Sequence, residues 1–131
     1  MNAEAKVQLA EKWVDHYSHT MVWGPDMVLQ RQSLHPEAVD ALGALSYEDP
    51  EAFLDVVLEI VHRSENDEAL MHVSCLLQVL LETQTPRVLP RIESMAVVDS
   101  AFRSLLAWFI PTEPKSELWS RIRLIAGDVP W

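Results

Sequence analysis

The chain has very little of the material from which β-hairpins, phosphate-binding loops and disulfides are made. Its three glycines in 131 residues leave few positions for tight hairpin turns or glycine-rich phosphate loops. Its one cysteine, Cys75, excludes a disulfide within the chain and fits a reducing compartment. The sequence therefore disfavours a β-rich fold and a disulfide-bonded secreted scaffold.

Basic charge and long apolar runs are also missing. Lysine and arginine number 10 against 20 acidic residues, for a net charge of −10. We expect no nucleic-acid partner, because binding to a phosphate backbone needs a basic surface. The first residues, MNAEAKVQLAEKW, lack the basic and apolar regions of a secretion signal. The most apolar run, ALMHVSCLLQVLL, is too short to span a bilayer. These features predict a cytoplasmic protein with no membrane partner.

What the sequence does contain is a repeated helix start, in which a capping residue is followed by proline and then an apolar run. It occurs in HPEAVDALGAL, DPEAFLDVVLEIV and TPRVLPRIESMAVV, and more loosely in TEPKSELWSRIRLI. We predict helices at residues 3–20, 36–45, 50–63, 67–82, 86–97, 100–109 and 115–126, with a weaker candidate at 26–33.

These segments predict an all-α fold, a compact bundle of six to eight short helices. At 131 residues, of which 49% are hydrophobic, the chain 1–131 is expected to form a single helical domain. Short connections favour antiparallel helical hairpins. HEAT-like stacking of the hairpins and an irregular bundle both stay open.

The segment 67–82 is apolar nearly all round, which is typical of a central helix. Cys75 is then expected to be a small buried hydrophobe, inaccessible to thiol reagents. Trp13, Trp108 and Trp119 lie within helical apolar patterns and are predicted to be core residues. Trp23 is expected to pack at a helix end.

Four motifs follow one another between residues 49 and 106. They are DPE at 49–51, the central apolar helix, I-E-x-x-A at 92–96 and F-R-x-L-L at 102–106. This order resembles a bacterial family of small acidic all-helical proteins whose function is uncharacterised, over about half the chain. The resemblance implies a helical fold and brings no catalytic residues.

The net charge is unevenly placed. Residues 37–68 contain ten acids and one base, so this quarter of the chain carries −9. Within helix 50–63, Glu51, Asp55 and Glu59 repeat every four residues with no lysine between them. Like charges at this spacing each cost about 0.2–0.5 kcal/mol. A solvated face and a docking ridge for a basic partner are both open.

The docking hypothesis assigns eight residues to partner binding. Trp131, at the end of the chain, either folds back on the domain or offers an exposed aromatic anchor. The full set is Glu48, Glu51, Asp55, Glu59, Glu65, Asp67, Glu68 and Trp131.

The stretch WVDHYSH raises the question of a metal site, because His16 and His19 lie three residues apart beside Asp15. A structural zinc site needs four ligands and a catalytic one at least three. Nothing local supplies the rest, so we predict no metal, no cofactor and no catalytic residues. The two histidines are expected to be solvated on an outer helix face.

Charge and fold together suggest a non-enzymatic protein-binding domain. In its most concrete form this is a bacterial immunity or antitoxin-type protein, which neutralises a basic partner such as a toxin through its acidic helix face. Two alternatives stay open. One is a small enzyme or metal-dependent module built on His16, His19 and Asp15, and the other is a helical scaffold or adaptor.

Overall fold

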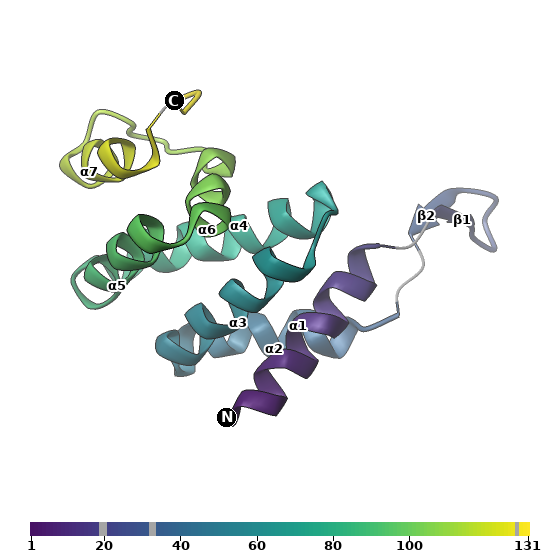
Figure 1. The fold of residues 1–131 in the computed structure, drawn as a ribbon. Coiled ribbons are helices and arrows are strands. Elements are labelled where there is room, and N and C mark those ends of the chain that lie inside the picture. The colour runs from purple at the N-terminus through teal and green to yellow at the C-terminus, as the bar shows by residue number, and fades with distance from the viewer. Residues whose placement is uncertain (19–20, 32–33, 128) are drawn as a thin grey trace. The chain divides into compact units, whose positions relative to one another are not determined.

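The computed structural model describes residues 1–18, 21–31, 34–127 and 129–131, and the fold is all-α, as predicted. The described residues form seven α-helices, a short 3-10 helix and one small β-hairpin (Figure 1). In chain order these are α1 (Ala3–Tyr17), β1 (Met21–Trp23), β2 (Leu29–Arg31), α2 (Pro36–Glu48), α3 (Pro50–Arg63), α4 (Asp67–Thr83), α5 (Thr85–Val98), α6 (Ser100–Leu105), η1 (Leu106–Trp108) and α7 (Glu117–Ala126).

Several helices begin at a residue whose side chain caps the first turn. Asp49 caps α3, since its Oδ1 accepts the backbone N–H of Ala52 at 3.2 Å, and Pro50 follows in the first turn. Asp99 caps α6 in the same way, accepting the N–H of Phe102 at 3.0 Å. These side chains satisfy backbone donors that have no partner inside the helix. The predicted starts at residues 3, 36, 50, 67, 86, 100 and 115 are confirmed within two residues.

The predicted helix at 26–33 is wrong, because this segment belongs to the β-hairpin. Strands β1 and β2 are antiparallel, with Trp23 opposite Leu29. The turn is closed by the N–H of Met27, which donates to the carbonyl of Gly24 at 3.0 Å. Met27 has a φ of 61°, in the left-handed region that glycine usually supplies in such loops. Since a methionine fills this position, the usual hairpin signal is missing from the sequence.

The contacts divide the chain into two compact units, Met1–Leu70 (unit 1) and Met71–Trp131 (unit 2). In unit 1, α1 and α3 lie side by side and run in the same direction (Figure 1). Lys6 meets Asp55 near their starts, and Asn66, which follows α3, donates to the carbonyl of Tyr17, the last residue of α1. The core of this unit includes Trp13, Leu42, Phe53, Leu54 and Ile60. The single-domain expectation stays a prediction.

Trp13 has a polar as well as an apolar role in unit 1. Its ring is 1% exposed, and its Nε1–H donates to the carbonyl of Ala69 at 3.1 Å. This bond satisfies the indole donor inside the core and holds α1 against the first turn of α4. The prediction that Trp13 is a core residue is confirmed.

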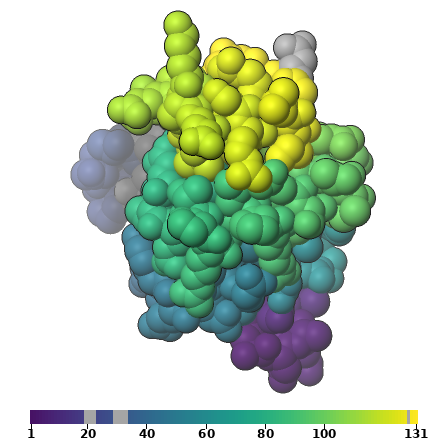
Figure 2. Space-filling model, turned by 90° about the vertical axis from the view of Figure 1, so that its left-hand side faces the viewer, coloured from purple at the N-terminus to yellow at the C-terminus, as the bar shows by residue number. Residues whose placement is uncertain are grey.

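Unit 2 is built from α5, α6, η1, α7 and most of α4. Its fully buried side chains include Leu77, Leu81, Ile92, Phe102, Leu105 and Leu106. Phe109 packs edge-on against Trp119 with ring centroids 5.4 Å apart, so Trp119 is a core residue as predicted. In Figure 2 the yellow residues of α7 and the C-terminus lie directly against the yellow-green segment that precedes α7.

The expectation that α4 is buried all round is wrong. Val73, Leu77 and Leu80 are buried, but Met71, Cys75 and Val79 form an exposed stripe at four-residue spacing. Apolar composition alone does not show which face of a helix its neighbours cover. Cys75 is therefore an exposed thiol rather than a core residue. Trp108 is also not a core residue, since it is 37% exposed in the 3-10 turn.

The α4 stripe lies beside a hollow of about 310 Å³ that Trp108 and Ile110 complete. Gln78 anchors its edge with two hydrogen bonds of 2.9 Å, one to the carbonyl and one from the N–H of Ile110. No helix in the described part of the chain combines the length and apolar character that crossing a bilayer needs.

Candidate protein-binding surface

The acidic residues assigned to partner binding all lie in unit 1. Glu48 is the last residue of α2, and Glu51, Asp55 and Glu59 follow along α3. Glu65 is in the α3–α4 connection, while Asp67 and Glu68 form the first turn of α4. None of the seven carboxylates is buried, and Asp55, Glu59 and Glu68 are half-exposed.

Two of the carboxylates in the row on α3 form ion pairs within the chain, so the docking hypothesis has no uninterrupted ridge there. Lys6 Nζ lies 2.6 Å from Asp55 Oδ2, and Arg63 Nη2 lies 3.1 Å from Glu59 Oε2. Lys6 comes from α1, 49 positions away in the chain, so the sequence pattern of α3 does not reveal it. Arg63 follows Glu59 by four residues, a spacing that favours an ion pair on a helix.

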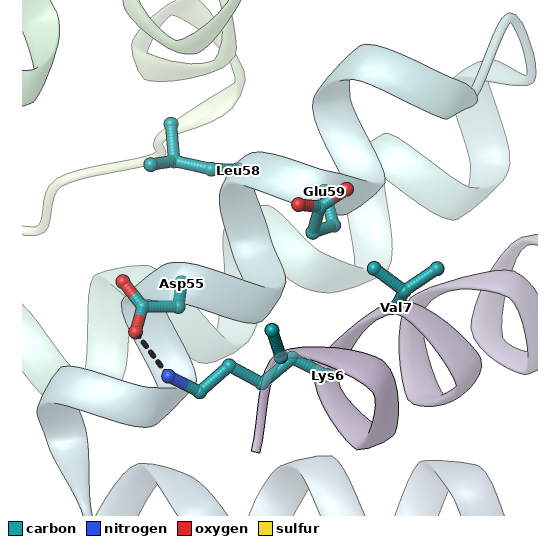
Figure 3. Close-up of a pocket in the computed structure, with 6 residues that line it drawn as sticks. Lys6, Val7, Asp55, Leu58 and Glu59 are labelled. Atoms are coloured by element: carbon teal, nitrogen blue, oxygen red, sulfur yellow. Dashed lines mark hydrogen bonds and ion pairs between the residues drawn. The ribbon is translucent and has the colours of Figure 1, made fainter. Parts of the chain in front are cut away.

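The Lys6–Asp55 pair lies at a hollow of about 270 Å³ between α1 and α3. Figure 3 shows Lys6 reaching from α1 to Asp55, with Val7, Leu58 and Glu59 around the hollow. Both side chains are partly solvated, 23% and 34% exposed. An ion pair in such a setting contributes about 0.2–1 kcal/mol. Its main effect is to hold α1 along α3 and to neutralise the centre of the acidic face.

The other acidic residues of this surface lie in two groups, one at each end of α3. The α2–α3 acidic group is Glu48, Asp49 and Glu51, and the α3–α4 acidic group is Glu65, Asp67 and Glu68. A helix of 14 residues separates its ends by about 20 Å. The surface therefore has two acidic groups with a neutralised centre, in place of one continuous ridge.

Charge divides between the two units more sharply than along the sequence. Unit 1 contains fourteen acidic residues and four lysines or arginines, whereas unit 2 contains six of each. The whole net charge of −10 thus belongs to unit 1. Two of its four bases, Lys6 and Arg63, are already paired with Asp55 and Glu59.

The prediction of two solvated histidines is wrong for His16, and His19 lies outside the described residues. His16 is 8% exposed, and its Nδ1 accepts the backbone N–H of His35 at 3.0 Å. The turn before α2 covers His16, and the sequence of α1 alone does not show this contact.

His35 is a residue that the sequence pattern did not single out. Its Nε2 lies 2.8 Å from Asp15 Oδ2, and its Nδ1 lies 3.4 Å from Glu37 Oε1. The pKa of Glu37 is lowered chiefly by a hydrogen bond from its own backbone N–H, with His35 and Lys12 adding to the effect. These contacts join the end of α1 to the start of α2. Within the described residues, no three histidine, cysteine or acidic side chains are placed to hold a metal ion.

Trp131 folds back, one of its two predicted states. Its ring packs edge-on against Trp119 with centroids 5.6 Å apart, and the Arg123 guanidinium lies 5.4 Å from the ring centroid. The side chain is half-buried. This packing occupies the ring within unit 2.

Three exposed apolar side chains of unit 1 lie on the hairpin. Trp23 is 68% exposed, Met27 77% and Val28 55%. The expectation that Trp23 packs at a helix end is wrong, because it ends β1. The dipeptide Gly24-Pro25, a common turn signal, was the one sequence sign of this arrangement.

Comparison of the chain with family models, with curated proteins and with solved structures gives no match. The resemblance to a bacterial helical family stays a prediction.

Proposed function

We propose that this protein is a non-enzymatic binding domain of the bacterial cytoplasm, which captures a basic protein through the acidic surface of unit 1. The observation that carries the proposal is the segregation of charge. One unit holds all of the net −10, and half of its lysines and arginines are already engaged in ion pairs. Self-repulsion of this kind opposes folding, and a partner of opposite charge relieves it.

The spacing of the two acidic groups suggests how the partner is selected. Fields of exposed charges decay over about 8–10 Å at physiological salt, and the groups at the ends of α3 are about 20 Å apart. Each group therefore acts as a separate docking point. A matching partner presents two basic patches at that separation, which gives both fast association and a defined register.

In its more specific form, the proposal is an immunity-type protein whose partner is a toxin. An enzyme that attacks nucleic acid needs a basic surface for the phosphate backbone. An acidic domain that covers that surface blocks access of the substrate. The product of the neighbouring gene in the source genome is the first candidate to test.

The test compares two charge reversals of equal size. Glu48→Lys with Glu65→Lys changes one exposed residue in each acidic group, whereas Glu82→Lys with Glu113→Lys changes two exposed residues of unit 2. Reversing Asp55 is avoided, because a lysine there would face Lys6. All four sites are exposed, so stability should move by about 0.5 kcal/mol or less per change.

Association with the purified partner is measured by stopped-flow mixing at low and high salt. The unit 1 variant should associate about tenfold more slowly at low salt and lose much of its salt dependence. The unit 2 variant should behave as wild type. Equal slowing by the two variants would mean that net charge alone matters, and no slowing by either would remove the acidic surface from the interface.

A further inference from the structure

The hairpin tip, defined as Trp23, Met27 and Val28, gathers three large apolar side chains on one exposed turn. Each is more than half exposed, and the carbonyl of Val28 accepts the N–H of Gly24, the neighbour of Trp23, at 2.9 Å. Single exposed apolar residues are ordinary on protein surfaces, but three of them within residues 23–28 of one turn are typical of an interaction site. Tryptophan and methionine are also enriched in protein interfaces.

The backbone of the tip is strained at Met27. Gly24 to Met27 form a tight turn with Pro25 at its second position, and Met27 then adopts a φ of 61°. A side chain in this region costs free energy that glycine would avoid. Met27 is 77% exposed, so packing within the chain does not explain why a methionine stands at this left-handed position. Strained residues of this kind cluster at binding sites.

The tip is attached to an acidic end of unit 1. His35, which follows the hairpin in the chain, lies against the end of α1 that precedes it, because the N–H of His35 donates to His16 Nδ1. Asn66 donates to the carbonyl of Tyr17 at 2.8 Å, which brings the α3–α4 acidic group to the same end. Asp26 adds a carboxylate within the turn itself, where it accepts the N–H of Val28 at 3.2 Å.

We propose that the hairpin tip is the apolar anchor of the partner interface and enters an apolar pocket rimmed by lysines and arginines. This inference rests on the proposed function, and it adds the feature that the acidic surface lacks. Interface energy concentrates in a few buried aromatic anchors surrounded by a polar rim. Charge steers the partner, and Trp23 with Met27 then supplies the apolar contact that slows its release.

The charge of unit 1 indicates which kind of partner binds the apolar tip. A second copy would bring another unit with fourteen acids and four bases against the first, so two units of like charge would repel each other. The anionic surface of a cytoplasmic membrane is repelled in the same way. A basic protein is the occupant that both the tip and its surroundings fit.

Three variants isolate the tip. Trp23→Ala removes the aromatic anchor. Tyr47→Ala is its matched control, since Tyr47 is 64% exposed in the same unit but lies at the other end of α2, beside Glu48. Met27→Gly removes one apolar contact while relieving the left-handed strain.

The probes are two synthetic peptides of equal length and lysine content. One carries leucines along one face of a helix, and the other carries serines at the same positions. Binding is followed by titration calorimetry at fixed salt, with circular dichroism confirming that each variant is folded. Wild type and Tyr47→Ala should prefer the leucine peptide. Trp23→Ala should lower the affinity for the leucine peptide about tenfold and leave the affinity for the serine peptide unchanged.

Met27→Gly gives an independent reading, because its effects on stability and binding should have opposite signs. It should raise the melting temperature and still lower the affinity for the leucine peptide. A higher melting temperature with unchanged binding would mean that Met27 has no part in the contact and would overturn its place in the anchor.

The other outcomes overturn the inference in distinguishable ways. If neither peptide binds, the acidic docking function fails and the anchor with it. If both bind and Trp23→Ala matches Tyr47→Ala, the anchor fails while acidic docking stands. Self-association in sedimentation that Trp23→Ala abolishes would assign the tip to a second copy. Tryptophan-dependent binding to phosphatidylcholine vesicles would assign it to a membrane.

Discussion

Replacing His16 with alanine should destabilise unit 1, in contrast to the sequence-based expectation that this histidine is solvated. The ring is 8% exposed, accepts the N–H of His35 at 3.0 Å and packs edge-on against Tyr17 with centroids 4.9 Å apart. The substitution removes both contacts at the junction from which the hairpin extends.

The expected magnitude follows from those two contacts. Leaving a partly buried N–H of His35 without an acceptor costs about 1–3 kcal/mol, and losing the ring pair with Tyr17 costs about 0.5–1.5 kcal/mol. Solvent reaches part of the site after truncation, so the sum is expected at about 2–4 kcal/mol. For a chain of this size, that lowers the melting temperature by about 10 °C.

The assay is urea denaturation followed by circular dichroism, with two companion variants. His62→Ala changes an exposed histidine of α3 in the same unit and should move stability by about 0.5 kcal/mol or less. His16→Asn keeps an acceptor near the position of Nδ1 and should recover part of the loss. If His16→Ala unfolds at the same urea concentration as His62→Ala, the burial of His16 and its bond to His35 are wrong.

Two further predictions concern the exposed thiol and the carboxylate at the start of α2. Cys75 should react with a thiol reagent in native buffer at the rate of an accessible cysteine. If it reacts only after urea unfolds the chain, Cys75 is buried and this prediction is wrong. Glu37 should titrate below 4.5 by NMR. Because its folded pKa is lowered, its contribution to stability is present above 4.5 and is lost as pH falls through that lowered pKa. His35→Gln should raise the Glu37 pKa only part of the way, since the backbone hydrogen bond is the larger cause. A Glu37 titration at or above 4.5 in wild type would contradict this.

The sequence by itself determined where the helices are. Asp49 followed by Pro50 predicts the start of α3, and the structure has the capping bond and the proline at those residues. Capping and the fixed φ of proline act over three or four neighbouring residues, so the information is local. The concentration of acidic residues in one part of the chain is likewise visible in the sequence, because it needs only counting.

The hairpin depended partly on local sequence and partly on tertiary structure. Its turn depends on local residues, but Met27 occupies a position whose backbone favours glycine. The local preference of that residue therefore pointed away from the structure. A strained position of this kind is where reasoning from propensity fails, since other contacts must hold the conformation in place.

Only the tertiary structure decided which side chains meet and which faces stay open. Lys6 neutralises Asp55 from 49 positions away, which turns a continuous row of carboxylates into two separate groups. His16 is buried because the backbone of His35 crosses its flank, while Cys75 is exposed because neighbouring helices cover only the opposite face of α4. The periodicity of one helix shows that it has an apolar face, but burial and ion pairing depend on the helices that pack against it.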